Sequence, residues 1–243
     1  MLTIRDVGLF VVRYFPFLET SARQLYSRLP GTWHDTPSSW LQARFRGKSR
    51  IRFIQVGAFD GITGDPLRSL VLEHPDWHGA LIEPQPAAFA RLRENYSGIL
   101  SQLHLFNCAV SDSSAGLEMC EIEEREIERL GLPAWSREVA SASEEHVKKH
   151  FPGVRTSKRA VLSMRISEVA EACGFEGVEL IVMDVEGHER RILDDVDFDS
   201  LGVEVVVFEH KHMTEPEYRA VSDRLASLGF ALRRYGRDTV AHR

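Results

Sequence analysis

Short apolar runs that alternate with helix-like segments constrain the fold of this chain most strongly. The runs are rich in Ile, Val, Leu and Phe, and they lie at residues 51–56, 80–83, 103–107, 180–184 and 203–208. Such runs are typical of parallel strands with helices on both faces of the sheet. Helix-like segments lie at 86–96, 167–173 and 217–228, and Ser167 is the expected N-cap of the second. The pattern predicts a doubly wound α/β fold with a mostly parallel sheet.

The last part of the chain follows a different pattern. Two strand-like segments, 230–235 and 239–242, flank Gly236-Arg237-Asp238. Two strands separated by a short turn containing glycine indicate a β-hairpin. We therefore expect the parallel sheet to finish with one antiparallel strand.

The composition indicates which binding partners and which cellular compartment to expect. The chain has 30 Lys and Arg against 36 Asp and Glu, a net charge of −6. Nucleic acid is not an expected partner, because such binders carry a basic face. Three widely spaced cysteines form neither a disulfide framework nor a CxxC metal motif, so we expect a reducing, cytoplasmic location.

Residues 1–50 differ from the rest and are expected to form a helical appendage to a domain at 51–243. They hold eight basic and three acidic residues, and one helical face of Val7–Leu18 is apolar. Such a helix packs on its own domain, binds an anionic membrane or a partner through residues 1–30, or mediates a homodimer. The sequence leaves these alternatives open.

One long stretch, residues 116–160, interrupts the α/β alternation. It is acidic at first, with six Glu against two Arg between Glu118 and Arg129, and it is helix-prone. Long insertions in compact domains are usually functional. We expect a helical cap that contributes to acceptor binding.

The turn after the first apolar run is rich in glycine, with Gly57 and Gly61 around Asp60. Such a turn lets a ligand approach the backbone closely. The dinucleotide fingerprint requires a further glycine where Phe59 stands. Asp60 would repel a diphosphate and attract a cationic ligand.

Glu83 ends the second run, 26 residues after Gly57. A carboxylate at this place can accept hydrogen bonds from both hydroxyls of a ribose. Together with the turn, it favours an adenosine-type ligand with a positive charge. S-adenosylmethionine meets both requirements.

Five segments then appear in a characteristic order: FIQVGAFDGITGDP, ALIEPQPAAFARLRENY, LFNCAVSD, LIVMDVEGHERRIL and VVVFEH. In this order the chain resembles the FkbM family of S-adenosylmethionine-dependent methyltransferases over roughly residues 51–242. The resemblance implies a class I methyltransferase fold, which is Rossmann-like, with a mostly parallel seven-stranded sheet and one antiparallel strand. It also implies O-methylation of a hydroxyl on a sugar, glycan or natural-product-like small molecule.

The resemblance also assigns cofactor-binding positions, with Glu83 and Pro84 at the ribose. Residues of the first turn would contact the methionine part, and the end of the third strand would border the adenine. Gln55 stands where many family members carry Asp. The remaining implied positions are Gly57, Ala58, Asp60, Gly61, Thr63, Asn107, Cys108, Ala109 and Asp184, the last beside the sulfonium.

Four side chains are candidates for the chemistry. Asp184, Glu186 and His188 alternate after the fourth run, and Glu209 follows the fifth. Ligands bind at the carboxyl ends of strands in open α/β sheets. An alcohol acceptor needs a base, and we expect Glu186 or Glu209 to serve, with His188 as a rival.

The sequence also contains possible metal ligands and leaves other functions open. Asp184, Glu186, Glu209, His210 and His212 carry suitable ligand atoms, but their spacing matches no fixed motif, so a divalent metal stays an open alternative that the sequence does not favour. N-methylation stays open. So do an NAD-binding oxidoreductase and a non-catalytic module that binds an adenosyl ligand.

Overall fold

The computed structural model describes residues 36–132, 136, 140–141, 144, 147–148 and 151–243. The chain divides into two units, Met1–Arg46 and Gly47–Arg243. Helix α3 (Pro37–Arg44) belongs to the first unit, and the Thr36 hydroxyl caps it by accepting a hydrogen bond from Ser39 N. The expected helix at Val7–Leu18 lies outside the described residues, so its membrane, partner or dimer contacts stay predictions. Among the described helices, none has the length and apolar character needed to cross a bilayer.

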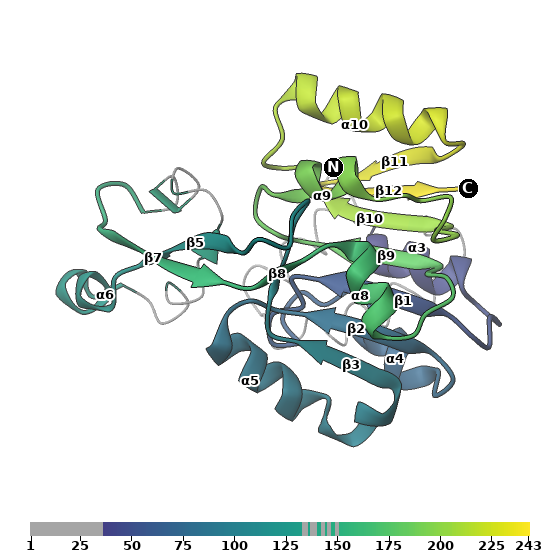
Figure 1. The fold of residues 1–243 in the computed structure, drawn as a ribbon, viewed down its shortest axis with the longest axis horizontal. Helices are drawn as coiled ribbons and strands as arrows, with labels where there is room; N and C mark the ends of the chain where they lie inside the picture. Colours follow the sequence, from purple (N-terminus) through teal and green to yellow (C-terminus); the bar gives the residue numbers. More distant parts are fainter. Residues whose placement is uncertain (1–35, 133–135, 137–139, 142–143, 145–146, 149–150) are drawn as a thin grey trace, which may run out of the picture. The chain divides into compact units, whose positions relative to one another are not determined.

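A seven-stranded sheet forms the centre of the second unit (Figure 1). Its strands, in spatial order, are β11 (Ala231–Tyr235), β12 (Asp238–His242), β10 (Val205–Glu209), β9 (Leu180–Met183), β1 (Arg52–Val56), β2 (His78–Ile82) and β3 (Leu103–Phe106). β12 runs antiparallel to both of its neighbours, and the other pairs are parallel. The predicted fold class is confirmed, including the single antiparallel strand.

Helices connect the strands, as right-handed crossovers between parallel strands require. They are α4 (Arg68–Glu73), α5 (Pro86–Asn95), the 3₁₀ helix η2 (Ser97–Gln102), α8 (Ile166–Ala172), α9 (Glu189–Asp195) and α10 (Glu215–Ser227). A capping box starts α10, in which the Thr214 hydroxyl and the Glu217 carboxylate bond each other's backbone N–H. The N-cap predicted for α8, Ser167, is wrong: the N-cap is Arg165, two residues earlier, whose N–H donates to Glu168.

The main core lies between one face of the sheet and the helices α8, α9 and α10. Alternate strand residues such as Ile54, Ile181 and Val206 pack there against Val169, Leu193 and Leu225. β9 and β10 are buried along their whole length. This burial explains why their sequences read as continuous apolar runs instead of alternating ones.

The described part of the insertion at 116–160 contains helix, as its glutamates suggest, but it also contains strands. A three-stranded antiparallel sheet of β5 (Leu117–Ile122), β6 (Ala140–Ser141) and β7 (Thr156–Val161) accompanies helix α6 (Glu124–Leu130). β5, β7 and α6 extend away from the central sheet (Figure 1). A short parallel pair, β4 (Ala109–Val110) and β8 (Ser163–Met164), lies at its base.

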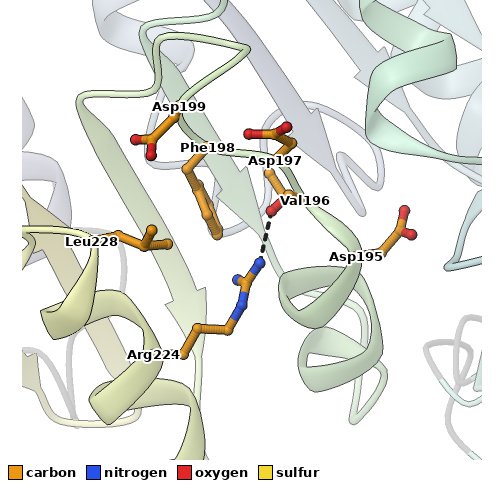
Figure 2. Close-up of a pocket in the computed structure, with 7 residues that line it drawn as sticks. All are labelled: Asp195, Val196, Asp197, Phe198, Asp199, Arg224 and Leu228. Carbon is orange, nitrogen blue, oxygen red and sulfur yellow. Dashed lines mark hydrogen bonds between the residues drawn. The ribbon is translucent and has the colours of Figure 1, made fainter.

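A pocket of about 200 Å³ is lined by residues of the α9–β10 connection together with Arg224 and Leu228 (Figure 2). The Arg224 guanidinium donates to Val196 O and lies over the Phe198 ring. The lining residues 196–199 come after α9 and before β10, so the pocket lies near the amino end of β10. Ligands of open α/β sheets bind at the opposite, carboxyl edge.

Candidate active site

Gly57 joins the carboxyl ends of three neighbouring strands. Its N–H and that of Ala58 donate to Ile82 O at the end of β2. Its φ is 75°, and a Cβ added there would lie 1.9 Å from Asp184 O at the end of β9. Only glycine permits both this backbone conformation and this close approach.

The rest of the turn is held by its own side chains. The Asp60 carboxylate accepts hydrogen bonds from Ile62 N at 2.9 Å, Thr63 N at 2.7 Å and the Thr63 hydroxyl at 2.8 Å. Burial acts to raise the pKa of Asp60, but these donors outweigh it and the pKa is lowered. Gly61 has φ 71°, and a Cβ there would overlap the Tyr96 ring. The turn therefore presents an ionised carboxylate on a fixed backbone.

Glu83 connects this turn to β2 and is only 4% exposed. Its carboxylate accepts from Phe59 N at 2.9 Å and Gln85 N at 2.8 Å. Burial raises the pKa of Glu83 to about 7 against the lowering effect of these two N–H groups. Phe59 has φ 49°, a strained value for a residue with a side chain, and such strain clusters at functional sites.

The end of β3 also reaches Glu83, because Asn107 donates from Nδ2 to Glu83 O at 2.8 Å. Cys108 and Ala109, expected near the adenine, are both buried, and the Cys108 side chain belongs to the main core. Pro84 O lies 3.4 Å from the Arg159 guanidinium of β7. The structure thus brings the predicted ribose and adenine residues to one place.

Gln55 lies on β1 with its side chain buried, and its Nε2 donates to Asp65 Oδ1 at 3.2 Å. Asp65 also accepts from the Tyr96 hydroxyl and from Leu67 N and Arg68 N. Asp65 thereby fixes the segment after the turn, a role that sequence reasoning missed. An aspartate shortly before a helix, a common capping residue, was the available signal.

A second group of side chains lies where β9 and β10 end. His212 Nε2 is 3.1 Å from Glu186 Oε2 and 3.2 Å from Glu209 Oε2. Carboxylate oxygens of Asp184, Glu189 and Glu209 also lie within 4.8 Å of one another. The structure therefore brings together three of the four predicted catalytic residues, Asp184, Glu186 and Glu209.

The density of negative charge shifts the protonation of these carboxylates. Burial raises the pKa of Glu209 to about 8, and Asp184 and Glu186 add to the rise. Asp184 keeps contact with solvent, yet the surrounding protein raises its pKa to about 6, with further contributions from Glu186 and Asp238. A cation in this region would relieve the repulsion.

His188, the fourth predicted catalytic residue, faces a different partner. It precedes α9, and its Nε2 lies 3.0 Å from the Ser111 hydroxyl. Burial and Arg191 lower its pKa, which leaves the imidazole neutral near pH 7. His210 similarly bonds the Thr239 hydroxyl through Nδ1.

Glu189 was missed by the sequence analysis and holds the loop that carries Glu186. Its side chain is fully buried, and its two oxygens accept from Val185 N and Gly187 N, each at 3.0 Å. Glu186 between them has φ 52°. The Glu189 carboxylate therefore stabilises a strained backbone that aims Glu186 at His212.

Replacing Glu189 by Gln is expected to lower the free energy of unfolding by about 1–3 kcal/mol, because one of the two N–H groups loses its acceptor. Chemical denaturation measures the change. Glu171→Gln, on the exposed side of α8, is the matched control and should stay near the wild-type value. Equal stability of the two variants would contradict this role for Glu189.

The insertion contacts both groups of site residues. From β6, the Ser141 hydroxyl donates to Glu186 O at 3.0 Å. From β7, Arg159 donates from Nε to Glu121 at 2.6 Å and reaches Pro84 O. The small sheet is therefore tied to the carboxyl edge at the ends of both β2 and β9.

Several solved structures are similar to this chain at low sequence identity. The structure of the methyltransferase FkbM from Methylobacillus flagellatus KT has 12% identity and a TM-score of 0.49, over 98% of this chain and 61% of that one. The precorrin-6y C5,15-methyltransferase from Geobacter metallireducens GS-15 has 10% identity and a TM-score of 0.45, over 84% of each chain. The Aeropyrum pernix fibrillarin with natively bound S-adenosyl-L-methionine has 11% identity and a TM-score of 0.37, over 79% of this chain and 66% of that one.

None of the curated proteins matches this chain. The family model of the methyltransferase FkbM domain does, over residues 55–232. That stretch is well over half of the chain and contains the glycine turn, Glu83 and the carboxylates after β9 and β10. The chain belongs to the FkbM methyltransferase family.

Proposed function

We propose that this methyltransferase transfers the methyl group of S-adenosylmethionine to a hydroxyl oxygen of a sugar, glycan or natural-product-like small molecule. One observation carries the proposal. Gly57 joins the end of β2, where Glu83 lies, to the end of β9, where Asp184 lies, so the buried Glu83 carboxylate and a carboxylate cluster flank one glycine turn.

The residues of the glycine turn, together with Glu83, are suited to binding the cofactor. Glu83 would accept hydrogen bonds from the two ribose hydroxyls. Asn107 and the segment after it would border the adenine. The ionised Asp60 and the turn backbone would hold the methionine part, whose α-ammonium is positively charged. Asp184 would lie beside the sulfonium.

The carboxylates at the ends of β9 and β10 are suited to binding and activating the acceptor. The acceptor oxygen bonds to the methyl carbon as the carbon–sulfur bond breaks, its electron pair returns to sulfur, and the hydroxyl proton passes to a base. Asp184 is our candidate for that base, while Glu186 and Glu209 orient the acceptor. His188 faces Ser111 and is the weaker candidate. Alignment in a site that excludes water supplies the main catalytic effect.

The insertion suits a role in acceptor selection. Ser141 and Arg159 tie the small sheet to the ends of β9 and β2, the two sides between which an acceptor would enter. Loops and insertions at the carboxyl edge commonly set specificity in α/β folds.

Binding of S-adenosylhomocysteine is expected to depend on pH through Glu83. Its pKa is raised to about 7. Only the ionised carboxylate accepts from both hydroxyls, so binding releases a proton at low pH. The affinity should fall about tenfold from pH 8 to pH 6 and stay level above pH 8. Calorimetry across this range measures it, and Glu83→Gln should show a flat profile. A flat wild-type profile would contradict the assignment.

Methyl transfer itself is tested with isotope-labelled S-adenosylmethionine and a panel of sugars and glycosylated small molecules. We expect label on an oxygen, identified by the NMR shift of the new methyl group. Asp184→Asn should retain binding of S-adenosylhomocysteine, which lacks the sulfonium charge beside Asp184, and lose transfer by about 10²–10⁴-fold, as removal of a general base does. Label on nitrogen would contradict O-methylation. Full activity of Asp184→Asn would contradict its role as the base.

A further inference from the structure

Glu186, Glu209 and His212 present three ligand atoms to one point. The His212 Nε2 atom lies 3.1 Å from Glu186 Oε2 and 3.2 Å from Glu209 Oε2. Two ligands at about 2.1 Å from one ion and at right angles are separated by about 3 Å. The observed separations therefore match adjacent positions in the coordination shell of a divalent cation.

Glu209 supplies an independent observation. Its residue is only 6% exposed, at the end of β10. Its Oε2 atom is buried and accepts no hydrogen bond from the described residues, among which His212 Nε2, at 3.2 Å, is its ion-pair partner. A buried carboxylate oxygen that accepts no hydrogen bond is costly, so a buried charge of this kind is usually paired or coordinates a metal. The oxygen faces the same point as His212 Nε2.

The other two ligands are held in place by the surrounding backbone. Glu189 fixes Val185 N and Gly187 N on both sides of Glu186, and Ser141 fixes Glu186 O. Gly187 lies against His212, since a Cβ added to Gly187 would be 3.5 Å from the His212 Cβ. Such backbone support around ligand side chains is what a built metal site requires.

We propose that Glu186, Glu209 and His212 bind one divalent cation at the carboxyl ends of β9 and β10. Two carboxylates and one imidazole suit a Mn²⁺-type ion, because carboxylate oxygen favours Mg²⁺ and Mn²⁺ while imidazole adds affinity for transition metals. Three protein ligands leave positions open for water or substrate oxygen.

The position of the ion beside Asp184 indicates a role in acceptor binding, and this step rests on the proposed function. The cluster adjoins Asp184, so the open positions face the place of the acceptor. A bound cation polarises a coordinated hydroxyl and orients it for attack. Asp184 is not one of the three ligands and remains available for the released proton. Fixed spacing in the sequence could not indicate this site, because its ligands come from two different strand ends.

The test uses the full chain, freed of metal with EDTA and titrated with Mn²⁺ while the free ion is followed by electron paramagnetic resonance. We expect one bound Mn²⁺ per chain. Glu209→Gln and His212→Ala should each weaken binding at least about tenfold. His78→Ala and Glu73→Gln, exposed residues near the amino edge of the sheet, are the controls and should bind as the wild type does.

Two outcomes would overturn the site. If the folded wild-type protein binds no Mn²⁺, the contacts of His212 with the two carboxylates serve the protein alone and the metal site does not exist. If Mn²⁺ binds equally well to Glu209→Gln and His212→Ala, the ion lies elsewhere. S-adenosylhomocysteine is titrated into the same samples without metal. If the protein binds S-adenosylhomocysteine but no Mn²⁺, only the metal site is overturned. If it binds Mn²⁺ but no S-adenosylhomocysteine, only the proposed cofactor is overturned.

Discussion

Glu83→Gln is expected to weaken S-adenosylhomocysteine binding by about 10²–10³-fold. Each hydrogen bond from a ribose hydroxyl to a carboxylate contributes about 1.5–3 kcal/mol, and about 1.4 kcal/mol corresponds to tenfold in affinity. The glutamine retains one acceptor oxygen but loses the charge and the second acceptor. Isothermal titration calorimetry at pH 8, where Glu83 is mostly ionised, gives the largest contrast.

The variant should still fold. Because the pKa of Glu83 is about 7, the protein already tolerates a neutral carboxyl at this position below that pH. Glu94→Gln, on the exposed side of the neighbouring α5, controls for the loss of one negative charge near the site. If Glu83→Gln binds as tightly as Glu94→Gln, the ribose does not contact Glu83.

Gly57→Ala is expected to lower the free energy of unfolding by about 3–5 kcal/mol, an effect at the upper end for single substitutions. The new Cβ would lie 1.9 Å from Asp184 O, which is backbone and cannot rotate away. Relief of the overlap requires β1 and β9 to separate where Asp184 N donates to Val56 O at 3.0 Å. Cofactor binding should be lost with it, since both sides of the site meet there.

Gly64→Ala separates the two causes of this loss. Gly64 has φ 69°, close to the 75° of Gly57, but nothing lies within 4 Å of a Cβ at that position. It therefore carries only the cost of a left-handed backbone, about 1–2 kcal/mol. Denaturant unfolding compares the two variants. Similar losses would show that the contact between Gly57 and Asp184 contributes little.

Much of the central sheet could be predicted from sequence because its middle strands are buried on both faces. β9 and β10 therefore appear as continuous apolar runs, and the hairpin signal at Gly236 places the antiparallel strand. The insertion could not be predicted in this way. The glutamates of β5 pair with distant basic residues of β7, namely Glu118 with Lys158 and Glu121 with Arg159. Read locally, the same glutamates indicate a helix.

The candidate site could likewise be predicted from the sequence only in part. Residues at strand ends, such as Glu83 and Asp184, could be named because parallel strands bring their carboxyl ends to one edge. Residues that act by supporting others could not. Glu189 lies one turn beyond the motif's conspicuous acids, and its role depends on a backbone with a positive φ at Glu186. The metal-binding role proposed for His212 follows only from its distances to Glu186 and Glu209 in the folded protein.

We propose that the carboxyl edge around Gly57 and Glu83 holds S-adenosylmethionine. Calorimetric titration of the wild-type protein with S-adenosylhomocysteine, with NAD run in parallel, tests it most directly. We predict one S-adenosylhomocysteine per chain, no heat from NAD, and about 2.7 kcal/mol of added stability at a hundred times the Kd. Binding of NAD alone, or no binding of S-adenosylhomocysteine by folded protein, would contradict the account.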